Sequence, residues 1–233
     1  MEIPNETAGF VFKLGFFRPQ FYQLAVSYDK ETRLTHSLLL TKGLNNIPFV
    51  SQFFSGLRPP QMHCELPLLL ALMSTEQIID TCIERLDTSD RKLNELEATM
   101  GHHEYDHRPK GNPLELDFLA TTRALNHVGR MVGADLSRLN SILIVLGKIL
   151  DWGKEIIKSQ IRYRDGENIT TTKEVTDGFH IANEKIDYLT DSCHALILRG
   201  EYEEKRARAL TQVVRSILSK LQLEADIPRS SNI

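Results

Sequence analysis

The chain has little cysteine and no long hydrophobic run. Its three cysteines, Cys64, Cys82 and Cys193, form no CxxC pair, and a sparse, odd set is typical of free thiols in a reducing compartment. The longest apolar stretches, residues 66–73 and 142–146, fall well below the roughly 18 residues that cross a bilayer. The first six residues are acidic rather than basic, so we expect no targeting leader. These features predict a cytosolic protein without membrane insertion.

Neither sign of charge dominates. The 28 basic and 31 acidic residues give a net charge of -3, which supplies no general attraction to nucleic acid. Basic residues gather at 154–164 and 199–208, but acidic neighbours interleave with them. This pattern is typical of ion pairs on a solvated helix face. We therefore expect no nucleic-acid partner.

Aromatic and β-branched residues cluster near the start of the chain. Residues 10–17, 21–28 and 34–40 predict three strands, with a hairpin loop at 29–33. Residues 44–57 predict one short helix that ends before a pair of prolines. We expect residues 1–60 to form a small N-terminal β and short-helix region.

After residue 66, apolar residues recur at steps of three and four over three long segments. This spacing predicts helices over about 67–100, 114–160 and 174–222. Gly101 marks the end of the first helix. Gly200 removes the core side chain from the third helix, and Glu203 then puts a charge there. We predict a continuous third helix, because no proline intervenes and an isolated glycine costs only about 1 kcal/mol.

Two capping signals place the starts of the longer helices. Asn112 and Glu115 predict a cap before the second helix, and residues 171–174 predict a capping box for the third. In the second helix, the expected core seam consists of Leu125, Val132, Leu136, Leu139, Leu143, Leu146, Leu150 and Ile157. Ile142, Ile149 and Ile156 are expected to widen this seam to a broad face.

The predicted fold class is mainly α with a small N-terminal β-hairpin region. The second and third helices have equal length and a polar connection, so they are expected to form a long antiparallel hairpin within a three-helix, coiled-coil-like bundle. The bundle is assigned to residues 61–223 and a flexible tail to 224–233. An apolar stripe of this length must be covered along its whole length. Either the three helices cover one another's stripes, or a second chain covers what remains.

The sharpest motif is a His-Glu-x-x-His stretch at His103, Glu104 and His107. On a helix, this spacing sets two imidazoles on one face for zinc and leaves the glutamate as general base. Gly101 and Pro109 flank the stretch, however, and the residue before a proline avoids helical geometry. A polar connector without metal is therefore the favoured interpretation, and a zinc hydrolase using these three residues is the alternative.

Several stretches resemble a group of filamentous-fungal proteins of unassigned function, some of them similar to the cytosolic part of CorA-type magnesium channels. The stretches are residues 101–105, 112–118, 121–126 and 199–206. The resemblance implies a small α/β region followed by very long helices. It does not extend to transport, because the chain has neither two transmembrane segments nor a Gly-Met-Asn signature.

Other catalytic signatures are absent from the sequence. It has no glycine-rich phosphate loop and no Gly-x-Ser-x-Gly elbow. Our leading hypothesis is a non-enzymatic cytosolic scaffold or protein-interaction module without a cofactor. It would bind a protein partner, or a second copy of itself, through its helices. The sequence does not indicate whether the protein binds a small-molecule ligand.

Overall fold

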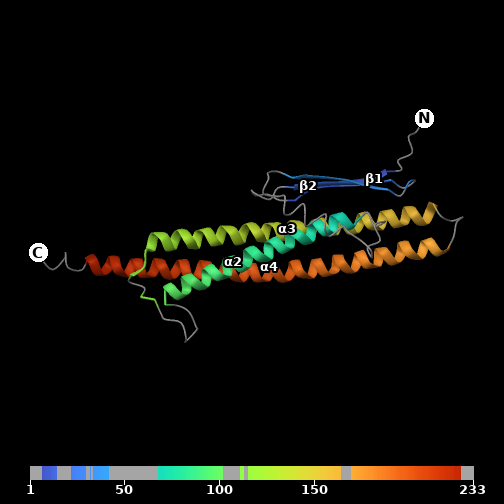
Figure 1. The fold of residues 1–233 in the computed structure, drawn as a ribbon. Coiled ribbons are helices and arrows are strands. Elements are labelled where there is room, and N and C mark those ends of the chain that lie inside the picture. Colours follow the sequence, from blue (N-terminus) through green and yellow to red (C-terminus); the bar gives the residue numbers. More distant parts are fainter. Residues whose placement is uncertain are drawn as a thin grey trace, which may run out of the picture. The chain divides into compact units, whose positions relative to one another are not determined.

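The computed structural model describes residues 7–14, 22–29, 32, 34–41, 68–101, 111–112, 115–163 and 169–226. Within these ranges the chain forms three strands and three long helices (Figure 1). They are β1 (Thr7–Leu14), β2 (Tyr22–Asp29), β3 (Thr35–Thr41), α2 (Leu69–Thr99), α3 (Phe118–Tyr163) and α4 (Ile169–Asp226). The predicted fold class, mainly helical with a small N-terminal antiparallel sheet, is confirmed. The short helix expected at 44–57 and the boundary at residues 60 and 61 lie outside the described residues.

The chain divides into two compact units, and each long helix contributes to both. Unit 1 comprises residues 1–80 and 141–193, and unit 2 comprises residues 81–140 and 194–233. Unit 1 therefore holds the sheet, the start of α2, the end of α3 and the start of α4. Unit 2 holds the remaining segments of the same helices.

The sheet has the order β1-β2-β3, and both strand pairs are antiparallel. The backbone amide of Asp29 donates to the carbonyl of Leu34 at 3.0 Å, and Asp29 Oδ1 accepts from the amide of Thr32 at 3.3 Å. Asp29, the last residue of β2, therefore bonds through both its backbone amide and its side chain to residues that precede β3. Leu24, Val26 and Tyr28 alternate along β2 and are at most 2% exposed, so one face of the central strand is buried.

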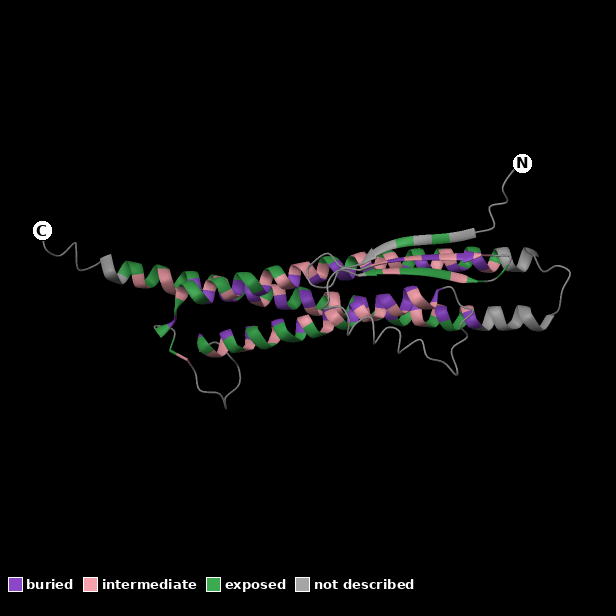
Figure 2. Ribbon diagram, turned by 45° about the horizontal axis from the view of Figure 1, so that its top comes forward, coloured by how far each residue is buried: buried purple, intermediate pink, exposed green. Residues whose placement is uncertain are grey.

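The core of unit 2 lies between all three helices. Each helix contributes a buried apolar side chain at least once in every two turns, which is the spacing of a bundle seam. The buried cluster consists of Leu86, Leu93 and Leu96 from α2, Leu125, Val128 and Val132 from α3, and Ala207, Leu210 and Val214 from α4, together with Met100 and Leu116. Figure 2 shows buried residues recurring along the helices with exposed residues between them.

Unit 1 has its own helical core. The buried apolar residues include Leu72, Ile78 and Ile79 of α2, Ile142, Leu146, Ile149 and Ile156 of α3, and Ala182, Ile186 and Leu189 of α4. Ile142, Ile149 and Ile156 were expected at the edge of the α3 seam, but they are buried while Leu143, Leu150 and Ile157 are only half-buried. The predicted seam is confirmed at Leu125, Val132, Leu139 and Leu146, which are all buried. At Leu143, Leu150 and Ile157 the prediction lies one residue too late, because adjacent apolar positions let either row face the partner helices.

The beginnings of α3 and α4 differ from the predictions. Asp117, not Asn112, caps α3, since its Oδ1 accepts from the amide of Ala120 at 2.9 Å. Asn112 and Glu115 instead close a separate turn, in which the amide of Glu115 donates to the carbonyl of Asn112 at 3.0 Å. The helix α4 starts at Ile169, so residues 171–174 lie inside it and do not form its capping box.

Two glycines carry out the roles expected of them. Gly101 adopts a positive φ of 70° and its amide bonds to the carbonyl of Ala98 at 3.1 Å, which ends α2. The helix α4 is continuous through Gly200. A Cβ at Gly200 would lie 2.8 Å from Leu136 Cδ2, so the missing side chain lets α3 and α4 approach closely.

None of the helices in the described ranges contains a segment apolar enough to cross a membrane.

Candidate functional site

The predicted zinc residues lie outside the described residues. His103, Glu104 and His107 all fall in the stretch 102–110, so a zinc site there stays a prediction. Among the residues that the structure does describe, no group of three or more His, Cys, Asp and Glu side chains is placed to hold a metal ion. The three other histidines of the helices, His127, His180 and His194, are all exposed.

Some of the predicted ion pairs along single helices form. Lys158 Nζ lies 3.0 Å from Glu155 Oε1, and Arg208 Nη2 lies 2.6 Å from Glu204 Oε1. Arg206, however, reaches across to α2, a contact that spacing within one helix does not reveal. Its partners lie more than a hundred residues earlier in the chain.

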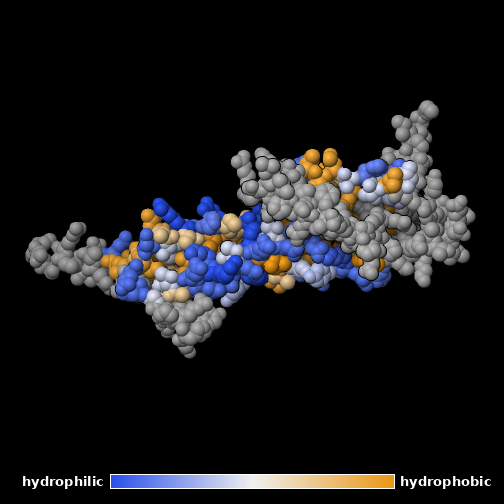
Figure 3. All heavy atoms as spheres, viewed as in Figure 1, coloured by the Kyte–Doolittle hydropathy of each residue, from blue (hydrophilic) through white to orange (hydrophobic). Residues whose placement is uncertain are grey.

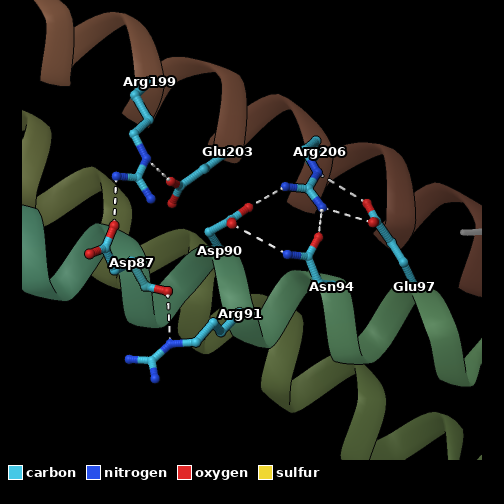
Figure 4. A network of polar contacts seen from close by, with 8 residues as sticks. All are labelled: Asp87, Asp90, Arg91, Asn94, Glu97, Arg199, Glu203 and Arg206. Atoms are coloured by element: carbon cyan, nitrogen blue, oxygen red, sulfur yellow. Dashed lines mark hydrogen bonds and ion pairs between the residues drawn. The ribbon is translucent and has the colours of Figure 1, made fainter. Parts of the chain in front are cut away.

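Arg206 is the centre of a polar network between α2 and α4 in unit 2 (Figure 4). Its Nε and Nη2 donate to Glu97 Oε1 and Oε2 at 3.1 and 2.7 Å, which is a bidentate pair. Its Nη1 also donates to Asp90 Oδ1 at 2.6 Å, and Nη2 donates to Asn94 Oδ1 at 2.7 Å. The hydrogen bond to Glu97 is the main cause that raises the pKa of Arg206. The network fixes a guanidinium on the surface between two helices.

Glu203 lies beside this network but inside the core stripe, where it is 1% exposed. Arg199 Nε donates to Glu203 Oε1 at 3.1 Å, while Oε2 has no hydrogen-bond partner. The guanidinium of Arg199 is shared, because its Nη1 also lies 2.7 Å from Asp87 Oδ1. Burial raises the pKa of Glu203 to about 7, with a further upward contribution from Asp90. Arg199 and Arg206 act in the opposite direction.

A second buried carboxylate, Asp135, lies between α2 and α3 in unit 2. It is 0% exposed and is paired with both Arg85, at 2.8 Å, and Arg138, at 2.7 Å. Burial, with a smaller contribution from Asp135, raises the pKa of the neighbouring Cys82 thiol to about 11. Cys82 is therefore a neutral packing residue at physiological pH and a poor nucleophile. The sequence analysis did not single out this cluster, although Asp135 and Arg138 stand at helical i,i+3 spacing.

Several large apolar side chains of α4 are exposed in the part of the chain that the structure describes. We call the set of Ile181, Tyr188, Leu198 and Tyr202 the α4 stripe. These residues are 57, 62, 69 and 62% exposed, respectively. Ile181 and Tyr188 are one heptad apart, and Tyr188 and Tyr202 are two heptads apart, so they share one side of the helix. Ala195 lies on the same side, at the midpoint between the tyrosines, and is also exposed.

Each tyrosine of the α4 stripe is accompanied by a cation that is bound to α2. In unit 1, Lys185 Nζ lies 5.3 Å from the Tyr188 ring centre and forms an ion pair with Glu76. In unit 2, Arg206 Cζ lies 5.7 Å from the Tyr202 ring centre and is held by Glu97 and Asp90. Cation–π contacts of this length are favourable by about 0.5–1 kcal/mol at exposed sites. The two rings are therefore exposed but restrained, as expected of anchor residues at an interface.

A second exposed apolar surface lies on the sheet of unit 1. Val11 is 74% exposed, Leu38 57% and Leu40 50%, and Val11 and Leu38 both flank Ala25 in the strand register. Figure 3 shows apolar side chains exposed over the strands.

Comparison with known proteins identifies no relative. No family model matches the chain, and no curated protein matches it. Functional inference therefore depends on the geometry of the described residues.

Proposed function

We propose that the chain is a non-enzymatic helical scaffold that associates with a second copy of itself through the α4 stripe. The observation that carries this proposal is the pair of exposed tyrosines, each beside a cation that is bound to α2. Tyrosine is one of the residue types that dominate binding energy at interfaces. A ring whose neighbours are already restrained also loses less conformational entropy when a partner covers it.

The sequence of α4 favours a self-complementary contact. Tyr188 and Tyr202 stand seven residues before and after Ala195. Two α4 helices that cross antiparallel at Ala195 would set Tyr188 of each copy opposite Tyr202 of the other, in a contact of twofold symmetry. The small side chain at the centre permits close approach of the two helices. A different protein with an apolar helix face would compete for this surface.

The proposed location is the cytosol. Cys82 and Cys193 are both buried and neither is part of a disulfide, which is the usual state of cysteine in a reducing compartment.

Sedimentation velocity over a concentration series tests the proposed association. We expect the mass of the unmodified chain to rise towards that of a dimer with concentration. The variant Tyr188→Glu/Tyr202→Glu should remain monomeric, because four carboxylates, two from each copy, would have to be desolvated in the contact. Ile144→Glu is the matched control, since Ile144 is 68% exposed on α3, and it should dimerise like the unmodified chain. A mass that is independent of concentration, or dimers that persist in the double variant, would contradict the proposal.

A further inference from the structure

An open groove between α2 and α3 in unit 2 belongs neither to the α4 stripe nor to the predicted zinc motif. Its volume is about 520 Å³, within the range of about 300–1,000 Å³ that is typical of small-molecule sites. Ala124, Val128 and Met131 of α3 provide an apolar wall, and Arg85, Arg91 and Lys92 of α2 provide basic side chains. The groove therefore combines an apolar surface with cations along one side.

The charges around the groove do not cancel. Among the residues that line the groove, Arg85, Arg91 and Lys92 are basic, and Glu95 is the one carboxylate. Arg85 is already paired with Asp135 at 2.8 Å, so Arg91 and Lys92 supply the positive charge that faces the groove. Lys92 is paired with Glu95 at 2.8 Å, and both side chains are largely exposed. An exposed pair of this kind is worth little and exchanges readily for another partner.

Among the basic residues of the groove, Arg91 has the guanidinium that can most readily bind a ligand. Its Nε donates to the backbone carbonyl of Asp87 at 3.3 Å, and its Nη2 donates to the hydroxyl of Thr88 at 3.3 Å. Both acceptors are neutral and both bonds are long, so a ligand carboxylate would form shorter, charge-assisted hydrogen bonds. Figure 4 shows Arg91 on α2, pointing away from the Arg206 network.

We propose that this groove binds an amphiphilic monoanion, namely an unbranched aliphatic carboxylate of medium chain length. The carboxylate pairs with Arg91 and Lys92, and the aliphatic chain lies along Ala124, Val128 and Met131. The apolar wall selects for a hydrocarbon chain, and the positive surplus selects for an anionic head. The site lies on α2 and α3, so it does not depend on association through α4.

Methyl NMR of the full chain labelled at its methionines tests the site, because Met131 lines the groove whereas Met73 and Met100 do not. Sodium decanoate is the probe, and decanol and acetate, which lack the charge and the chain respectively, are its controls. We expect saturable shifts of the Met131 methyl signal with decanoate and much weaker effects with either control. Decanol binding as tightly as decanoate, or no shift of Met131 at millimolar decanoate, would overturn the proposal.

Two substitutions identify the groups that bind. Arg91→Gln/Lys92→Gln should weaken decanoate binding roughly ten-fold, since it removes two charge-assisted contacts. Arg208→Gln is the matched control, because Arg208 is exposed on α4 and pairs only with Glu204 among the described residues; it should bind normally. Ala124→Glu should abolish binding by placing a carboxylate in the groove. Equal affinity for all variants would contradict the assignment.

The same titration separates this proposal from the proposed association. Tyr188→Glu/Tyr202→Glu should bind decanoate as tightly as the unmodified chain does. Loss of binding in that variant would show that the groove depends on the dimer and would contradict the separate site proposed for α2 and α3.

Discussion

Two buried carboxylates in unit 2 are stabilised to very different degrees. Asp135 contacts two arginines and both of its oxygens are bonded. Glu203 shares one arginine with Asp87, and one of its oxygens has no partner. A buried ion is favourable only when its charge and its hydrogen-bonding capacity are both satisfied. Asp135 should therefore support the fold at neutral pH, whereas ionised Glu203 should weaken it.

The folded-state pKa of Glu203, about 7, lies above the ordinary value of 4.5. The folded chain then binds this proton more tightly than the unfolded chain does. The resulting stabilisation is complete below about pH 4.5 and is lost as the pH rises through about 7. The groups that face Glu203 are Asp87 and Asp90 from α2 and Arg199 and Arg206 from α4.

We predict that Glu203→Gln stabilises the protein at pH 8 by roughly 1–3 kcal/mol and has little effect near pH 4.5. Glutamine keeps an acceptor for Arg199 but never ionises. Urea denaturation of both proteins at the two pH values measures the difference. An equal effect at both pH values would mean that ionisation of Glu203 is not the cause.

Removal of the Asp135 carboxylate should have the opposite effect. Asp135→Ala leaves Arg85 and Arg138 facing each other without their shared anion, and we expect a loss of about 3–5 kcal/mol at pH 7. Asp151→Ala is the control, because Asp151 is exposed on α3, and it should change stability by no more than about 0.5 kcal/mol. Similar small losses for both variants, measured by urea denaturation, would argue against a structural role for Asp135.

At the scale of the elements, the contact between α2 and α4 in unit 2 depends on the shape of one guanidinium. Arg206 forms a fork with Glu97 and also reaches Asp90 and Asn94. Arg206→Lys keeps the charge but cannot form the bidentate pair. We predict a loss of about 1–2 kcal/mol for Arg206→Lys. Arg208→Lys, at an exposed pair within α4, should lose less than about 0.5 kcal/mol.

Chemical denaturation of the two lysine variants checks this prediction. Equal stability of Arg206→Lys and Arg208→Lys would show that the network adds no more than a surface ion pair.

The helices and their buried positions were largely predictable from the sequence. Apolar residues at steps of three and four all lie on one side of a helix, and that side is the one that packs into the core. The residues that recur at steps of four and three along the predicted first long helix are all buried, namely Leu68, Leu72, Thr75, Ile79, Cys82, Leu86, Ser89, Leu93, Leu96 and Met100. The predicted seam of α3 is right at Leu125, Val132, Leu139 and Leu146. It is one residue late at Leu143, Leu150 and Ile157, since two adjacent apolar rows compete there. The start of α3 was also wrong, because Asp117 offers a cap close to the one expected at Asn112.

The interhelical polar contacts could not be predicted. Arg206 and its partners on α2 stand more than a hundred residues apart in sequence, and pairing them requires the register of two helices. The exposed tyrosines were missed for a related reason. The sequence shows which residues follow a heptad, but only the packed helices show which side of α4 remains uncovered.

At the scale of the whole molecule, the scaffold and the zinc hydrolase make opposite predictions about metal content. The scaffold interpretation predicts that the purified full chain contains no stoichiometric zinc. Elemental analysis of the chain and of His103→Ala measures this directly. One zinc per chain that disappears in His103→Ala would support the hydrolase, with Glu104 as its general base.

Photo-crosslinking from position 202 tests the association through α4 most directly. A photoreactive phenylalanine analogue replaces Tyr202 in one sample and Glu155, an exposed residue of α3, in the control sample. The antiparallel contact predicts crosslinked dimers from position 202, with the crosslink on the partner copy near Tyr188, and none from position 155. Monomer alone after irradiation at position 202, or equal dimer yields from both positions, would contradict the account.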